Sequence, residues 1–75
     1  MKTYYVDVSH LTADDKETVY DKIDAMDFMT SRYYGNGNKL IGLVVSWDKA
    51  SDFGAYVNLL NLPFKIDFHE GETPR

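Results

Sequence analysis

Apolar and polar residues alternate in two segments near the ends of the chain, 3–8 and 64–69. In the first segment, one face carries Tyr4, Val6 and Val8 and the other carries Thr3, Tyr5 and Asp7. In the second, Phe64, Ile66 and Phe68 alternate with Lys65, Asp67 and His69. A period of two residues is typical of a strand with one buried and one open face. Both segments are therefore predicted to be β-strands.

A helix is predicted after the first strand, from about Ala13 to Met26. Thr12 stands three residues before Asp15, which is a variant of the capping box, and acidic residues in the first turn suit the helix dipole. At 100° per residue, the apolar positions on one face are Val19, Tyr20, Ile23 and Met26. This face is expected to pack on the core.

A second helix is predicted from a cap at Asp48 through about Leu60. Its inward positions at helical spacing are Phe53, Tyr56, Val57 and Leu60. Pro63 follows shortly after and is expected to prevent the helix from continuing.

A β-hairpin is predicted between the two helices. The segment 30–34 is rich in β-formers, and 35–38 reads Gly-Asn-Gly-Asn, residues that tolerate the positive φ of a tight turn. The next segment, from Lys39 to Ser46 or Trp47, is apolar at nearly every position. Such a run predicts an interior strand, with Gly42 on its more open face.

The predicted order is βαββαβ, an α+β arrangement. Two helices on one face of a four-stranded antiparallel sheet is the compact solution for this order, the ferredoxin-like plait. In this plait the first and third strands are central and the second and fourth lie at the edges. We expect a single domain over 1–69 and a mobile tail over 70–75, which has no apolar anchor.

Composition limits the classes of function. The 75 residues suffice for one small domain, and a hydrophobic share of 44% supports a packed core. The absence of Cys excludes disulfides and thiolate metal sites and favours a cytoplasmic location. A net charge of −4 opposes direct nucleic-acid binding, and no apolar run approaches the length of a membrane helix. Neither nucleic acid nor membrane is therefore an expected partner.

An acidic stripe is predicted on the first helix. Its members follow one another at spacings of three, four and three residues: Asp14, Glu17, Asp21 and Asp24. Such a stripe creates a local negative field that could steer a protein with a basic, nucleic-acid-binding surface. The alternative is an ordinary solvated helix face that serves solubility.

Tyrosines form a second candidate surface. The pairs Tyr4-Tyr5 and Tyr33-Tyr34 each place one ring on the open face of the sheet if both segments are regular strands. We therefore expect exposure of Tyr5 and of one residue of the second pair, and take Tyr5 and Tyr34 as candidate partner contacts, because Tyr is favoured at binding surfaces. Alternatively, these rings only cover a sheet that lacks a second layer.

A third candidate lies where the first and last strands meet. Asp7, Asp67 and His69 are expected to converge on the open face, as ligands for a divalent cation or as a base and its orienting group. The position of Asp7 at the end of the first strand resembles the Cas2 and VapD nuclease families. That resemblance implies a metal-dependent nuclease or phosphodiesterase; the alternative is a set of solvated polar side chains.

In size, acidity and richness in Tyr and Asp, the whole chain resembles small acidic ferredoxin-like proteins of tailed bacteriophages. That resemblance implies an inhibitor or adaptor that blocks a host enzyme or defence complex in the host cytoplasm. The chain has no nucleotide loop and no catalytic Ser or His constellation, so we expect a binding module without a cofactor. We also expect a homodimer, through the edge strand 30–34 or through the open faces of the sheet. An alternative function is that of a plait dimer that senses a small molecule.

Overall fold

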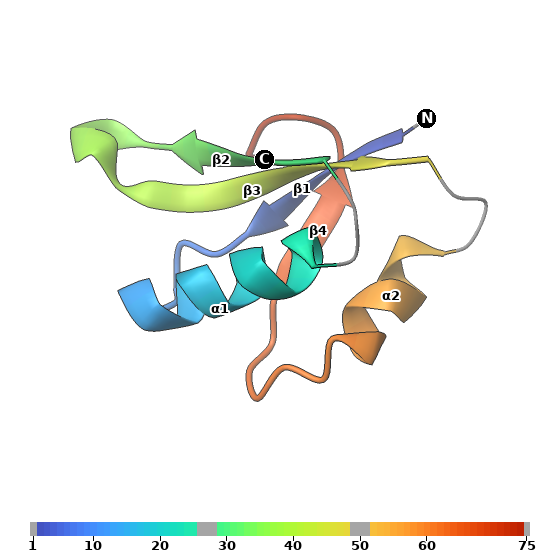
Figure 1. Ribbon diagram of the computed structural model, residues 1–75. Helices are drawn as coiled ribbons and strands as arrows, with labels where there is room; N and C mark the ends of the chain where they lie inside the picture. Colours follow the sequence, from blue (N-terminus) through green and yellow to red (C-terminus); the bar gives the residue numbers. More distant parts are fainter. Residues whose placement is uncertain (1, 26–28, 49–51, 75) are drawn as a thin grey trace.

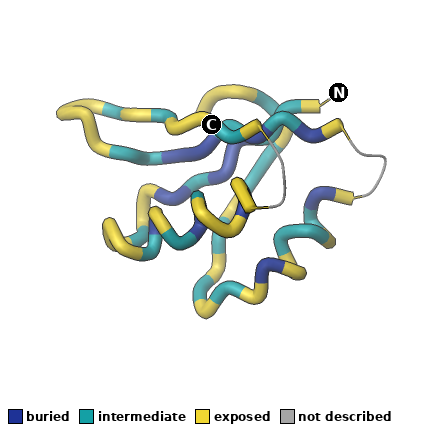
Figure 2. Tube along the Cα trace, in the orientation of Figure 1, coloured by how far each residue is buried: buried dark blue, intermediate teal, exposed yellow. Residues whose placement is uncertain are grey.

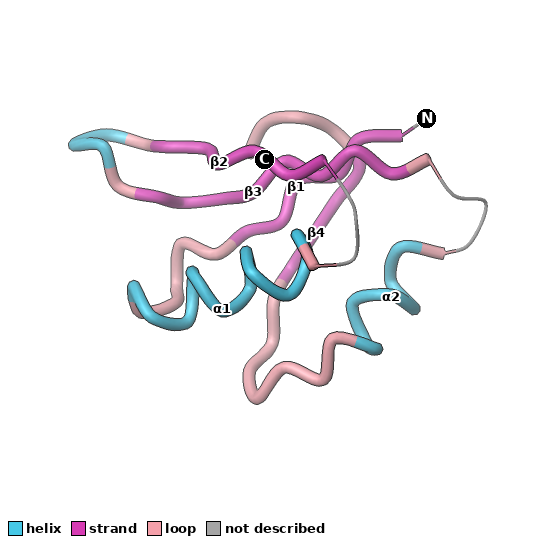
Figure 3. Tube along the Cα trace, viewed as in Figure 1, coloured by secondary structure: helices cyan, strands magenta, loops and turns pink. Residues whose placement is uncertain are grey.

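The observed order of helices and strands is the predicted one. The computed structural model describes residues 2–25, 29–48 and 52–74 (Figure 1). The elements are β1 (Lys2–Asp7), α1 (Ala13–Asp24), β2 (Met29–Tyr34), the 3₁₀ turn η1 (Asn36–Asn38), β3 (Leu40–Trp47), α2 (Phe53–Leu59) and β4 (Asp67–Glu70). Figure 3 shows the β2–β3 hairpin extending beyond the two helices.

The four strands form one antiparallel sheet in the order β2-β3-β1-β4. Both helices lie on the same face of this sheet, and among the described residues no helix covers the other face (Figure 1). The protein is therefore an α+β ferredoxin-like plait, with β1 and β3 in the centre and β2 and β4 at the edges. The prediction of fold and strand order is confirmed.

The β2–β3 hairpin closes through the predicted Gly-Asn-Gly-Asn turn. Gly37 and Asn38 have φ of 73° and 58°, the left-handed region in which Gly and Asn are tolerated. Beyond the turn the pairing is irregular, because Tyr34 lies opposite Leu40 whereas Tyr33 lies opposite Gly42. The extra residue of this bulge is Ile41, so the regular part of the ladder covers residues 29–33 of β2.

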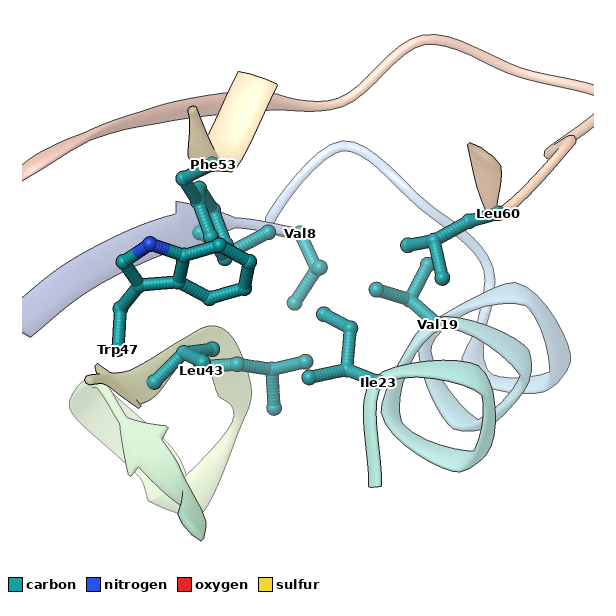
Figure 4. Close-up of a cluster of buried hydrophobic side chains, with 9 residues drawn as sticks. Val8, Val19, Ile23, Leu43, Trp47, Phe53 and Leu60 are labelled. Atoms are coloured by element: carbon teal, nitrogen blue, oxygen red, sulfur yellow. The ribbon is translucent and has the colours of Figure 1, made fainter. Parts of the chain in front are cut away.

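The core fills the space between the sheet and the two helices (Figures 2 and 4). Its buried members are Val6, Val8, Val19, Ile23, Leu43, Val45, Trp47, Phe53 and Leu60. Aromatic rings join α2 to the sheet: Phe53 stacks on Tyr4 with centroids 4.5 Å apart and meets Trp47 edge-on at 5.1 Å. Such ring pairs add to the free energy gained by burying their surface.

Helix α1 begins as predicted. The Thr12 hydroxyl accepts a hydrogen bond of 3.2 Å from the backbone N–H of Asp15. Val19 and Ile23 are buried, and Tyr20 packs partly buried against them. The helix ends at Asp24 rather than Met26, and Met26 lies outside the described residues.

Helix α2 begins later than predicted. Its N-cap is Asp52, whose carboxylate accepts a 3.0 Å hydrogen bond from the Gly54 N–H, so the assignment of Asp48 as the cap is wrong. Asp48 instead follows the last residue of β3 and is exposed, because β3 continues to the buried Trp47. The helical face is as expected, with Phe53 and Leu60 buried and Tyr56 and Val57 packed against the core.

Strand β4 is shorter than the alternating pattern. It begins at Asp67, opposite Asp7, because β1 ends at Asp7 and gives the preceding residues no strand to pair with. Phe64 and Ile66 still pack against the core from an irregular segment. The strand includes Glu70, which the pattern assigned to the tail.

The C-terminal residues turn back over the open face of the sheet (Figure 1). The Gly71 N–H donates to the Thr3 carbonyl at 2.8 Å, and the Thr73 carbonyl lies 2.8 Å from Nε2 of His69. The mobility of 70–75 stays a prediction, but these two contacts define a path for 71–74 across the sheet.

Candidate functional site

The outer side of α1 carries four exposed carboxylates, which we call the acidic face: Asp14, Glu17, Asp21 and Asp24. They lie on the side of the helix away from Val19 and Ile23, the residues that α1 buries in the core. Because the helix rises 1.5 Å per residue, the first and last of these residues are about 15 Å apart along its axis. The sequence pattern predicted this face and its exposure.

The nearest basic residue of the helix does not neutralise the acidic face. Lys16 has only 6% of its surface exposed, and its ammonium group donates a 2.6 Å hydrogen bond to the carbonyl of Leu40 on β3. Its charge is therefore directed to the hairpin and away from the outer side of α1. Lys22, in the last turn, is the exposed lysine of this helix.

One member of the acidic face is paired across elements. The Arg32 guanidinium on β2 lies 3.2 Å from the Glu17 carboxylate and 4.0 Å from the centroid of the Tyr20 ring. In the described part of the chain the other ion pair joins Lys2 to Glu70. Within 2–25, 29–48 and 52–74, Asp14, Asp21 and Asp24 therefore take part in no ion pair.

The open face of the sheet differs from expectation at Tyr5. Its side chain is 2% exposed, so the prediction that it is exposed is wrong. The ring lies between those of Tyr33 and His69, at centroid distances of 5.5 and 5.4 Å. Burial, with smaller contributions from Asp7 and Tyr33, raises the pKa of the Tyr5 phenol.

Of the second tyrosine pair, Tyr34 is the more exposed. It retains 54% of its surface, while Tyr33 is half-buried against Tyr5. Tyr34 is thus available to a partner, whereas Tyr5 is covered by neighbouring rings. Its role as a partner contact stays a prediction.

The third candidate group does come together. Asp7, Asp67 and His69 line one hollow of about 350 Å³, which Tyr5, Phe68 and Pro74 complete. Asp7 and Asp67 are opposite each other in the β1–β4 ladder, as expected for neighbouring strands.

Asp7 and His69 are each held by a local partner. One Asp7 carboxylate oxygen accepts hydrogen bonds from the Ser9 hydroxyl at 2.7 Å and the Ser9 N–H at 2.9 Å. The hydroxyl bond is the main reason that the pKa of Asp7 is lowered; desolvation opposes it, and His10 and His69 contribute in the same direction as Ser9. His69 directs Nε2 to the Thr73 carbonyl.

The hydrogen bonds of Asp7 to Ser9 stabilise the turn after β1. Within the ranges that the structure describes, no three His, Asp or Glu side chains are grouped so that they could hold a metal ion. Asp7, Asp67 and His69 therefore share a hollow without forming a set of ligands. The nuclease alternative gains no support from their geometry.

Two residues that contact or flank the acidic face, Lys16 and Arg32, were not proposed as site residues from the sequence. Lys16 lies three residues before Val19 and seven before Ile23, so its helical position did place it on the inward side. Arg32 gave no such signal, because its contact with Glu17 joins residues fifteen positions apart in different elements. The first could have been found from periodicity and the second only from the folded structure.

Comparisons with known proteins assign no function to this site, so it is interpreted from its geometry alone. No protein-family model, curated protein or solved structure matches this chain. Among the helices of the described residues, none is long and apolar enough to cross a membrane.

Proposed function

We propose that this protein is a non-enzymatic binding module that attaches to a basic surface of another protein through the acidic face of α1. In this role it acts as an inhibitor or adaptor of its partner. The observation that carries the proposal is the orientation of Lys16: its ammonium group is directed to the hairpin, and within the described residues Asp14, Asp21 and Asp24 take part in no ion pair.

The chemistry of the partner follows from the charge and shape of this face. Exposed carboxylates along about 15 Å of one helix match a row of Lys and Arg side chains on a protein surface. Surfaces of that kind ordinarily hold the phosphates of nucleic acid. A module that occupies such a surface competes with nucleic acid, which gives the inhibitor role its physical basis.

Electrostatic steering also determines how binding should respond to salt. The Debye length falls from about 10 Å at 0.1 M to about 3 Å at 1 M ionic strength. Attraction between exposed charges is therefore largely screened at high salt. The association rate with a basic partner is expected to fall as salt is added.

The test compares two variants with the same total charge. The first neutralises the acidic face with Asp14→Asn, Glu17→Gln, Asp21→Asn and Asp24→Asn. The control neutralises four exposed acids elsewhere with Asp48→Asn, Asp67→Asn, Glu70→Gln and Glu72→Gln. Immobilised wild type and both variants are exposed to lysate of the source cell or its host, and the captured proteins are then purified and titrated back individually.

The proposal expects one stoichiometric protein that binds wild type and the control but not the α1 variant. Nucleic acid added to the purified pair should compete with this protein module. Equal loss of binding in both variants would show that net charge alone is responsible and would contradict the proposal. Retention by the α1 variant would contradict it as well, and circular dichroism confirms that each variant is folded.

A further inference from the structure

The sheet has two edge strands, and β2 is less protected against pairing with another strand than β4 is. β2 is an edge strand of six residues, Met29–Tyr34, and its one charged residue is Arg32. At the opposite edge, β4 has four residues, with the acids Asp67 and Glu70 at its ends. Short strands and charged residues protect edges from pairing, so protection is strong at β4 and weak at β2.

Each end of β2 carries an exposed apolar side chain, and that of Met29 belongs to the regular part of the ladder. Three large hydrophobic side chains are exposed among the described residues, and two of them, Met29 at 79% and Tyr34 at 54%, belong to this strand. An edge strand directs the N–H and C=O groups of alternate residues away from its neighbour. β2 therefore offers both a backbone ladder and apolar contacts.

We infer that β2 pairs antiparallel with β2 of a second copy of this chain, with Ser31 on the two-fold axis, to form a continuous eight-stranded sheet. This edge adjoins the acidic face through the Arg32–Glu17 ion pair, but the inference does not depend on the proposed function. The occupant is a second copy because the strand is complementary to itself in this register, as its two faces show.

The two faces of β2 are assigned by its pairing with β3. Thr30 and Arg32 are opposite the buried Val45 and Leu43, so they lie on the helix side of the sheet. Met29, Ser31 and Tyr33 lie on the open side, where Tyr33 contacts the ring of Tyr5. A two-fold axis perpendicular to the sheet keeps each face on its own side, so residues of the same face meet across the junction.

The register follows from charge and from the bulge. With Ser31 on the axis, Met29 faces Tyr33 of the other copy and Thr30 faces its Arg32. With Arg32 on the axis, two guanidinium groups are directly opposite, which is unfavourable. The regular ladder also covers residues 29–33, because the bulge lies between Tyr33 and Tyr34, and Ser31 is the centre of that range.

The contacts of the chosen register are favourable on the open side. Met29 of each copy meets Tyr33 of the other, which creates two contacts of a thioether with an aromatic ring. The small Ser31 side chains meet at the axis without charge. The paired area is small by the standard of permanent dimers, so a reversible dimer that forms at high protein concentration is expected.

The absence of Cys from the sequence allows a specific cross-linking test. Residues opposite each other in an antiparallel pair have Cα atoms about 4.5–5.5 Å apart, within the range of a disulfide. Ser31→Cys should therefore form a disulfide-linked dimer under mild oxidation. Met29→Cys is the matched control on the same face and edge, because its two copies are four positions out of register, about 13 Å apart.

A second experiment uses the axis itself. Ser31→Lys and Ser31→Glu each place two like charges together and should sediment as monomers, whereas an equimolar mixture should form a heterodimer. Wild type should show a reversible dimer in sedimentation equilibrium. A wild-type monomer at the highest soluble concentration, cross-linking of Met29→Cys as efficient as that of Ser31→Cys, or a charge-swapped mixture that stays monomeric would each overturn the inference.

Discussion

The phenol ring of Tyr5 lies directly over Gly42, in the space that a side chain at that position would occupy. A Cβ atom built on Gly42 would overlap the ring of Tyr5, which is itself held between Tyr33 and His69. The glycine is therefore required by the close approach of a ring on the neighbouring strand. This contact buries Tyr5 on a sheet face that no helix or strand in the described part of the chain covers.

Gly42→Ala is expected to destabilise the fold by about 1–3 kcal/mol, the usual cost of forcing extra volume into a packed site. In the interior of a strand, replacing Gly by Ala otherwise stabilises the fold by about 0.5–1 kcal/mol. A loss of stability in Gly42→Ala would therefore indicate a steric overlap. Urea denaturation monitored through Trp47 measures the free energy of unfolding.

The control for this substitution is the Tyr5→Ala background, in which the overlapping ring is absent. There Gly42→Ala should be neutral or stabilising, and the difference between backgrounds is the coupling energy of the two positions. If Gly42→Ala were equally costly with and without the ring, the contact with Tyr5 would not be the cause.

Asp7 is expected to make the free energy of unfolding depend on pH in the acidic range. Its pKa in the folded protein is lowered below its ordinary value, chiefly by the Ser9 hydroxyl. A group with a lowered pKa contributes stability that is present above its unfolded pKa and is lost as pH falls through the folded pKa. Urea denaturation from neutral to acidic pH should show this loss below the unfolded value.

Ser9→Ala removes the hydroxyl donor and should bring the pKa of Asp7 back toward its ordinary value. The acid loss of stability should therefore be smaller than in wild type. Ser31→Ala is the matched control, because Ser31 lies on β2 and has no contact with Asp7. An unchanged acid profile in Ser9→Ala would show that the hydrogen bond does not stabilise the carboxylate.

Lys16 is expected to contribute to stability although it is charged. Lys16→Ala removes both the hydrogen bond to the Leu40 carbonyl and the packing of the side-chain stem, at a cost of about 2 kcal/mol. Lys22→Ala, on the exposed side of the same helix, should change stability by no more than about 0.5 kcal/mol. Thermal and urea unfolding of both variants compare the two lysines; equal effects would contradict a structural role for Lys16.

The N-cap of α2 is Asp52 and not Asp48, the residue assigned from the sequence. Asp52→Ala should lower stability by about 1 kcal/mol, because the Gly54 N–H loses its acceptor. Asp48→Ala should leave stability within about 0.5 kcal/mol of wild type, since Asp48 does not cap the helix. A larger effect at Asp48 than at Asp52 would restore the interpretation from sequence.

The fold could be predicted because its signals are local. Alternation at 3–8, the Thr12 cap and the Gly-Asn turn each specify their own element, and their order admits few topologies. The start of α2 could not be predicted in the same way. The pattern assigned the cap to Asp48, whereas the cap is Asp52, because β3 extends to bury Trp47 and leaves Asp48 just beyond the strand.

The candidate site could be predicted only where it belongs to one helix. The acidic face follows from periodicity within α1 alone. The state of Tyr5 depends on Tyr33, Gly42 and His69, which come from three other strands, and no pattern in β1 contains that information. Likewise, the ion pair of Glu17 with Arg32 depends on how α1 packs against β2.

The position of β1 in the middle of the sheet has a consequence for how the protein is made. β1 leaves the ribosome before the other three strands of the sheet, and it pairs with β3 on one side and with β4, the last of the four in chain order, on the other. Until 67–70 emerge, one edge of β1 has no neighbour, so the sheet is completed only after these residues have been translated. Such distant pairing slows folding relative to a helical bundle of similar size. A nascent chain that is stalled with residues 67–70 still inside the ribosome should therefore be sensitive to protease. A longer nascent chain, in which β4 has emerged and can pair with β1, should be resistant.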